Sequence, residues 1–153
     1  MKPFVYRFER KLGLVKQEEQ VVRLELQTAM AERERILEEL DRLRNRIVCL
    51  EDAIRAHQGN TLLPEVGLTR EYLPILKERF LRLTDELQLA EEKVETIRRK
   101  LLVKKRETMT FEKLREHDWQ AYLYEVNREE QKIIDELAIT SGSRDIMHRG
   151  TGS

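Results

Sequence analysis

The chain has 153 residues, of which 38% are charged, 40% are apolar and only 6% are aromatic. The apolar share is too high for a disordered chain and the charge too dense for a compact sphere, so we expect an elongated fold. The 29 basic and 29 acidic residues cancel, which favours proteins over nucleic acid or a membrane surface as partners. Because we find no signal peptide and no apolar run of about 18 residues, we expect a soluble cytoplasmic protein without direct membrane insertion.

The first predicted element is a long helix over about residues 4–57. Steps of three and four residues from Val5 to Ile54 visit fifteen positions, of which thirteen are apolar, where composition alone would give about six. The two exceptions are Glu19 and Arg33. This spacing is the apolar stripe of a coiled coil. Cys49 falls on the outer face, where we expect no function for it.

A turn is predicted over residues 58–68, which hold two of the six glycines and one of the three prolines. A connection this short returns the next helix alongside the first, so the pair should be antiparallel. Thr69 is the expected N-cap of the second helix, whereas Pro74 should either kink that helix or mark its start. Four apolar side chains either staple the turn or face a target: Leu62, Leu63, Val66 and Leu68.

The second predicted helix covers about residues 69–138. Its stripe is apolar at every position from Leu76 to Leu101, after which apolar residues reappear one position out of phase, as in a skipped heptad. If residues whose numbers sum to about 127 face each other, Trp119 lies opposite Phe8. Beyond about Val126 the second helix then has no partner within the chain.

Together these elements predict an all-α fold, with two long helices forming one antiparallel coiled-coil hairpin over residues 1–139 and a flexible tail over residues 140–153. A two-helix hairpin has no interior beyond its seam, so it offers no water-shielded pocket for catalysis. His57, His117 and His148 lie far apart along it, and the sequence contains no glycine-rich phosphate loop. We therefore expect no enzyme, no cofactor and no metal site.

One short segment of the second helix is strongly basic. Six basic residues occur within nine positions without an acid between them: Arg98, Arg99, Lys100, Lys104, Lys105 and Arg106. The segment is either a solvated helix face or a docking site for an acidic protein surface. Binding of nucleic acid is disfavoured because no aromatic residues are interleaved with the charges.

The end of the second helix carries apolar residues without a predicted partner: Val126, Ile133, Ile134 and Leu137. Fully burying each of them would contribute about 1.5 to 3 kcal/mol, so we expect something to cover them. The alternatives are a partner protein, self-association, or an N-terminal segment that folds back.

Three stretches resemble landmarks of the bacterial flagellar export protein family FliJ. Residues 4–14, with Glu18 and Glu19 after them, resemble the start of that family, and residues 111–115 and 129–138 resemble its second and third landmarks. The resemblance spans nearly the whole chain, in the right order. It implies a two-stranded antiparallel coiled coil similar to the central stalk of rotary ATPases, in agreement with the periodicity.

The resemblance also implies a role in motility, as a non-enzymatic part of the flagellar type III export apparatus. The implied partners are the export ATPase hexamer, the cytoplasmic domain of the membrane export gate, and export chaperones. The implied location is the cytoplasm, peripherally at the inner face of the cell membrane at the flagellar base. We expect the protein alone to be a monomer.

By analogy with a rotary stalk, we expect the end of the hairpin that carries both termini to enter the ATPase ring. The residues expected to contact the ring are Trp119, Leu123, Val126, Ile133, Ile134 and Leu137. In this family the gate contact lies toward the turn, which by geometry points to outward residues Tyr72, Ile75 and Arg79. Two other functions remain open: the stalk protein of an injection-type secretion system, and a generic coiled-coil adaptor or dimerisation rod.

Overall fold

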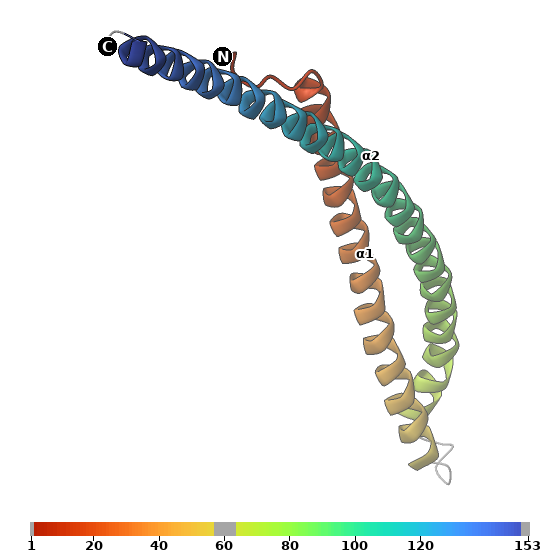
Figure 1. Cartoon of the computed structure of the whole chain (residues 1–153). Helices are drawn as coiled ribbons and strands as arrows, with labels where there is room; N and C mark the ends of the chain where they lie inside the picture. Colours follow the sequence, from red (N-terminus) through yellow and green to blue (C-terminus); the bar gives the residue numbers. More distant parts are fainter. Residues whose placement is uncertain (1, 57–63, 151–153) are drawn as a thin grey trace. The chain divides into compact units, whose positions relative to one another are not determined.

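The computed structural model describes residues 2–56 and 64–150, except for the side chains of residues 64–66. It contains helix α1, Glu9–Ala56, and helix α2, Pro64–Gly150, and among the described residues there is no strand (Figure 1). The two helices pack against each other, so the expected all-α helical hairpin is confirmed. The chain divides into a hairpin unit, Gln17–Lys105, and a terminal unit, Met1–Lys16 with Arg106–Ser153.

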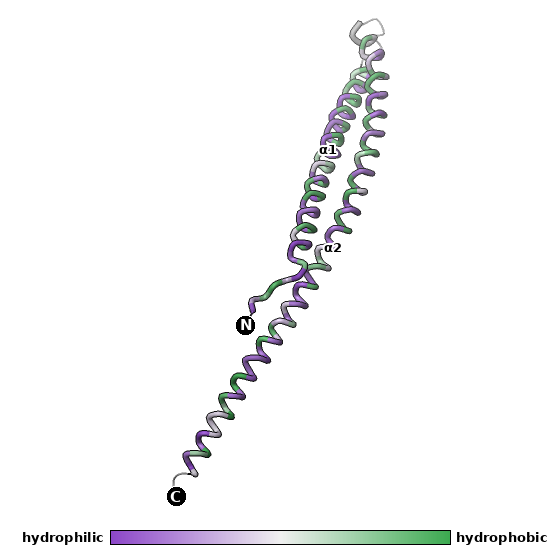
Figure 2. Tube along the Cα trace, turned by 90° about the horizontal axis from the view of Figure 1, so that it is seen from above, coloured by the Kyte–Doolittle hydropathy of each residue, from purple (hydrophilic) through white to green (hydrophobic). Residues whose placement is uncertain are grey.

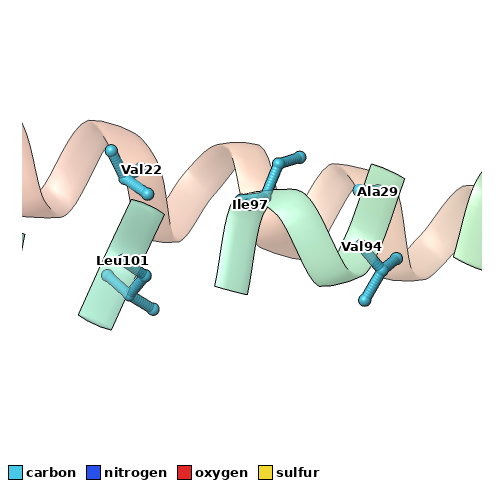
Figure 3. Close-up of a cluster of buried hydrophobic side chains, with 5 residues drawn as sticks. All are labelled: Val22, Ala29, Val94, Ile97 and Leu101. Carbon is cyan, nitrogen blue, oxygen red and sulfur yellow. The ribbon is translucent and has the colours of Figure 1, made fainter. Parts of the chain in front are cut away.

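The hairpin unit is held together by the two predicted apolar stripes. Figure 3 shows one cluster, formed by Val22, Ala29, Val94, Ile97 and Leu101. A second cluster is formed by Ile36, Leu40, Leu43, Leu76 and Leu83. Val94 is only 2% exposed, and burial of such a side chain contributes about 1.5 to 3 kcal/mol. The prediction of the stripe is therefore confirmed in this unit.

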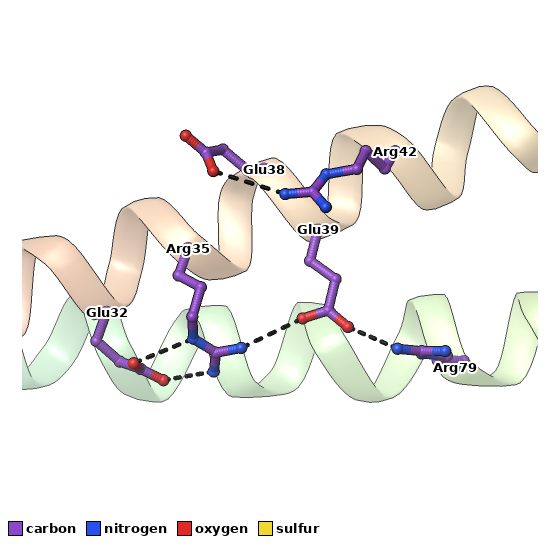
Figure 4. Close-up of polar contacts among 6 residues, drawn as sticks. All are labelled: Glu32, Arg35, Glu38, Glu39, Arg42 and Arg79. Carbon is purple, nitrogen blue, oxygen red and sulfur yellow. Dashed lines mark hydrogen bonds and ion pairs between the residues drawn. The ribbon is translucent and has the colours of Figure 1, made fainter.

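Charged side chains flank the seam of the hairpin unit. Arg79 of α2 pairs with Glu39 of α1 at 2.6 Å, and Glu39 also pairs with Arg35 (Figure 4). On the other flank, Lys77 pairs with Glu51 at 2.9 Å, and this hydrogen bond lowers the pKa of the Glu51 carboxyl below its ordinary value. These exposed pairs favour one register of the two helices, although each contributes little stability.

In the terminal unit, the chain before α1 is not helical and runs beside α2. The Tyr6 side chain is buried, and its hydroxyl donates a hydrogen bond of 2.7 Å to the carbonyl oxygen of Phe111. The Tyr122 hydroxyl donates to the carbonyl oxygen of Lys2 at 2.9 Å. Burial raises the pKa of Tyr6, because the apolar surroundings disfavour its charged form.

The heptad positions predicted before Glu9 are wrong. Val5 is 80% exposed, and Trp119 contacts Phe4 instead of the expected Phe8. The physical reason is that α1 begins at Glu9, where the Phe8 carbonyl accepts the first helical hydrogen bond, so helical spacing does not apply to the residues before it. Phe8 packs against another aromatic side chain of α2, with ring centroids 5.9 Å apart.

The bounds of α2 also differ from those expected. The helix begins at Pro64, which suits the first helical position because proline has no N–H to leave unpaired, so Thr69 is not the N-cap. Pro74 lies inside the helix and does not mark its start. The helix ends at Gly150 instead of near residue 138. Gly142 does not stop it, because one glycine in a helix costs only about 1 kcal/mol. The expectations for Leu62, Leu63 and the Val66 side chain lie outside the described residues.

Polar residues occupy part of the seam, and they explain the apparent skip after Leu101. Lys104 is half-buried and Thr108 is buried, so the original phase of the stripe continues through polar side chains. Lys104 pairs with Glu18 of α1 at 2.9 Å. Burial shifts to the out-of-phase positions only farther along α2, where Leu123 and Val126 are half-buried and Glu125 of the original phase is exposed.

Candidate functional site

The end of α2 exposes a row of large aliphatic side chains. Every residue from Asn127 to Gly150 is exposed. Ile133 and Ile134 are each 57% exposed and Leu137 is 64% exposed; we call these three the open stripe. Figure 2 shows hydrophobic and hydrophilic residues interspersed along this part of α2. The predicted exposure is confirmed for these three residues but not for Val126, which is half-buried.

The other three residues expected at the ATPase lie on the same face of the helix as the open stripe. Trp119, Leu123 and Val126 precede Ile133 at helical spacings of four, three and seven residues. They are only partly open: Leu123 and Val126 are half-buried and Trp119 is 38% exposed. Phe4 packs on Trp119 with its ring centroid 5.1 Å away. The N-terminal segment therefore reaches this first part of the face, and the open stripe stays exposed.

The three residues expected at the gate all lie on the outside of the hairpin unit. Ile75 is 60% exposed and Tyr72 is 41% exposed. The Arg46 guanidinium lies 5.4 Å from the Tyr72 ring centroid, and Arg79 pairs with Glu39 across the seam (Figure 4). These contacts hold the two polar members in place and leave Ile75 as an exposed apolar side chain between them.

The basic segment is partly neutralised within the hairpin. Lys100 pairs with Glu25 at 3.5 Å and Lys104 with Glu18 at 2.9 Å, while Arg99 pairs with an acid one turn earlier. Within the described part of the chain, the members that make no ion pair are Arg98, Lys105 and Arg106. The pairing supports a solvated helix face more than a concentrated docking site.

A shallow apolar groove in the hairpin unit was not predicted. It is lined by Arg44, Ile47, Val48, Lys77, Phe80 and Leu81. Val48 and Leu81 are 47% and 65% exposed. The signal in the sequence is that each of them directly follows a stripe residue, so an apolar side chain stands at an outer position.

The described residues show little that could support chemistry. Residues 2–56 and 64–150 contain no group of three side chains able to hold a metal ion. Cys49 is exposed, as expected, and His117 lies 3.8 Å from Asp118. Over the same described ranges, neither helix has a stretch apolar enough to cross a membrane.

Comparison with known proteins identifies the family. The profile described as "Flagellar FliJ protein" matches residues 4–145, a span that includes all three stretches of resemblance. Searches of curated proteins and of solved structures found no match. The chain therefore belongs to the flagellar FliJ family, whose members are non-catalytic flagellar proteins related to export.

Proposed function

We propose that this protein is a non-enzymatic component of the flagellar type III export apparatus, and that it binds the ring of the export ATPase through the end of α2. The observation that carries the proposal is the open stripe, in which three aliphatic side chains are each more than half exposed. Covering them would contribute about 1.5 to 3 kcal/mol per side chain, so a partner gains affinity there. Family membership supports the choice of the ATPase as that partner.

The test is a pull-down with the candidate ATPase, followed by measurement of ATP turnover. We expect the wild type to bind and to raise turnover. The triple variant Ile133→Ser, Ile134→Ser, Leu137→Ser should lose both effects, because it removes the apolar contacts while keeping the exposed helix. Circular dichroism should show nearly unchanged helical content, since serine costs only about 0.5 kcal/mol per helical position.

A matched control uses the same substitution elsewhere on the same helix end. Ile139 and Ile146 are 72% and 74% exposed, and their spacing places them away from the open stripe. The variant Ile139→Ser, Ile146→Ser should bind and stimulate like the wild type. Undiminished stimulation by the triple variant contradicts the proposal, as does an equal loss in the control.

A second contact, with the cytoplasmic domain of the export gate, is proposed at Tyr72, Ile75 and Arg79. Their exposure on one flank of the hairpin supports it. Alanine at all three positions should weaken binding of the gate domain at least tenfold. Alanine at Val48 and Leu81, in the groove on the other flank, is the control and should change it less than twofold. Unchanged binding in the triple alanine variant removes this contact from the proposal.

Export chaperones are the third class of proposed partner, and the proposed location is the cytoplasmic face of the membrane at the flagellar base. The free protein should be a monomer, because we propose that the open stripe binds a different protein and not a second copy of this chain. Light scattering separates this role from that of a dimerisation rod. A stable dimer that the serine triple variant converts to a monomer would favour the rod.

A further inference from the structure

The face of α2 that bears the open stripe has one acidic edge. Asp118, Glu125, Glu129 and Glu136 follow one another at intervals of seven, four and seven residues, so they lie along one side of the helix. Glu129 and Glu136 stand one turn before and one turn after Ile133 and therefore flank it. The opposite edge of the same face is uncharged, with Gln120, Asn127, Gln131 and Ala138 at intervals of seven, four and seven, and Glu130 lies on the face between the two edges.

Asp118 pairs with Arg7, but among the described residues the rest of the acidic edge is not neutralised. Residues 125–139 contain five acidic and two basic residues, a net charge of −3. Among the described residues, none of the ion pairs involves Glu125, Glu129 or Glu136. Lys132 is within reach of the latter two along the helix, yet it pairs with neither in the structure. These three members of the edge are therefore available to a cationic partner.

The beginning of this face already holds a segment of complementary chemistry. The N-terminal segment places Phe4 on Trp119, with ring centroids 5.1 Å apart. It also places the Arg7 Nε atom 3.6 Å from the Asp118 carboxylate, the first member of the acidic edge. One segment of chain thus supplies both an apolar side chain, Phe4, that packs on the face and a cation, Arg7, that pairs with the acidic edge.

We infer that the open stripe binds a protein segment of this same chemistry, with apolar side chains over Ile133 and Leu137 and with Lys or Arg beside Glu129 and Glu136. The inference rests on the proposed function, and it defines the surface that the ATPase must present: an apolar patch with a basic border on one side. The apolar contacts supply most of the affinity, while the charges speed the encounter and fix the orientation of the helix.

The experiment titrates full-length protein onto the ATPase hexamer at several salt concentrations. The edge variant is Glu129→Lys with Glu136→Lys. The control variant is Asp135→Lys with Asp145→Lys, which changes the net charge equally at exposed positions of the same helix off the acidic edge. We expect the edge variant to bind at least tenfold more weakly and to lose most of the salt dependence, while the control stays within about twofold of the wild type.

The outcomes separate this inference from the proposed function. If the two variants are weakened equally, or if the edge variant binds as well as the wild type or better, the acidic edge is not a contact and the inference is overturned. Loss of binding in the serine triple variant of the open stripe would then still support the proposed function. If the wild type does not bind the ATPase, both are overturned together.

Discussion

Two stretches of α2 carry large aliphatic residues at helical spacing but differ in how far these residues are buried. Between Leu76 and Leu101, the stripe residues are buried or half-buried against α1. Between Asn127 and Gly150, every residue is exposed, Ile133 and Leu137 included. The difference teaches that apolar spacing predicts a face able to bury itself, whereas burial depends on whether the chain supplies a second helix. The first stretch stabilises the fold, and we propose that the second binds a partner.

The largest effect should come from placing a charge in each stretch. Val94→Asp puts a carboxylate at a position that is 2% exposed, without a compensating partner, and should lower the free energy of unfolding by several kcal/mol. Ile133→Asp should change it by less than about 0.5 kcal/mol, because that side chain already faces water. Urea denaturation followed by circular dichroism measures both. Comparable losses in the two variants would show that the end of α2 is packed.

A milder version of the same comparison uses truncation. Leu101→Ala leaves a cavity in the seam and should cost about 2 to 4 kcal/mol, whereas Leu137→Ala should be close to neutral. Thermal unfolding of the two variants under identical conditions provides the measurement. A large destabilisation by Leu137→Ala would mean that a second copy or another segment covers the open stripe in the free protein.

An intermediate case is the N-terminal segment, which covers only the start of the exposed face. Tyr6→Phe removes the hydrogen bond to the Phe111 carbonyl and should cost about 1 kcal/mol. Phe4→Ala should expose Trp119 and shift its fluorescence to longer wavelength; since this is the only tryptophan, the signal reports that contact alone. An unchanged emission spectrum in Phe4→Ala would contradict the packing of the segment on α2.

The smallest effect concerns pH. The hydrogen bond from Lys77 lowers the pKa of Glu51 below its ordinary value of 4.5, so the charged form is favoured in the folded state. The stabilisation is therefore present above pH 4.5 and is lost as pH falls through the lowered folded value. The difference in urea midpoint between wild type and Glu51→Gln should shrink over that range. Glu129→Gln, which removes an exposed acid without an ion pair, should show no such pH-dependent difference.

The seam could be predicted from the sequence because one physical rule, alternate steps of three and four residues, decides it from Leu12 to Leu101. The same rule failed before Glu9, where it assigned Val5 to the seam although the backbone there is not helical. At Thr108 the spacing rule holds, but the residue is polar although it is buried, so the skip in the seam that was inferred from polarity is wrong there. Burial there follows position along the helix and not the side chain's polarity.

Less of the candidate site could be predicted. The exposed residues from Ile133 to Leu137 followed from the unequal lengths of the two helices. The packing of the N-terminal segment on Trp119 could not be predicted in the same way, because a non-helical segment has no periodic signal. Such a segment was considered only as one alternative. The acidic edge lies within the helix predicted over residues 69–138, but its role could be inferred only from the N-terminal segment, which shows the chemistry that this face accepts.

Hydrogen exchange along α2, with and without the export ATPase, tests the central claim most directly. In the free protein, we expect strong protection around Val94 and fast exchange over residues 127–139, because every residue there is exposed. Adding the ATPase should protect residues 129–137 and leave the hairpin unit unchanged. Protection of residues 129–137 in the free protein, or no change there with the ATPase bound, would contradict the account.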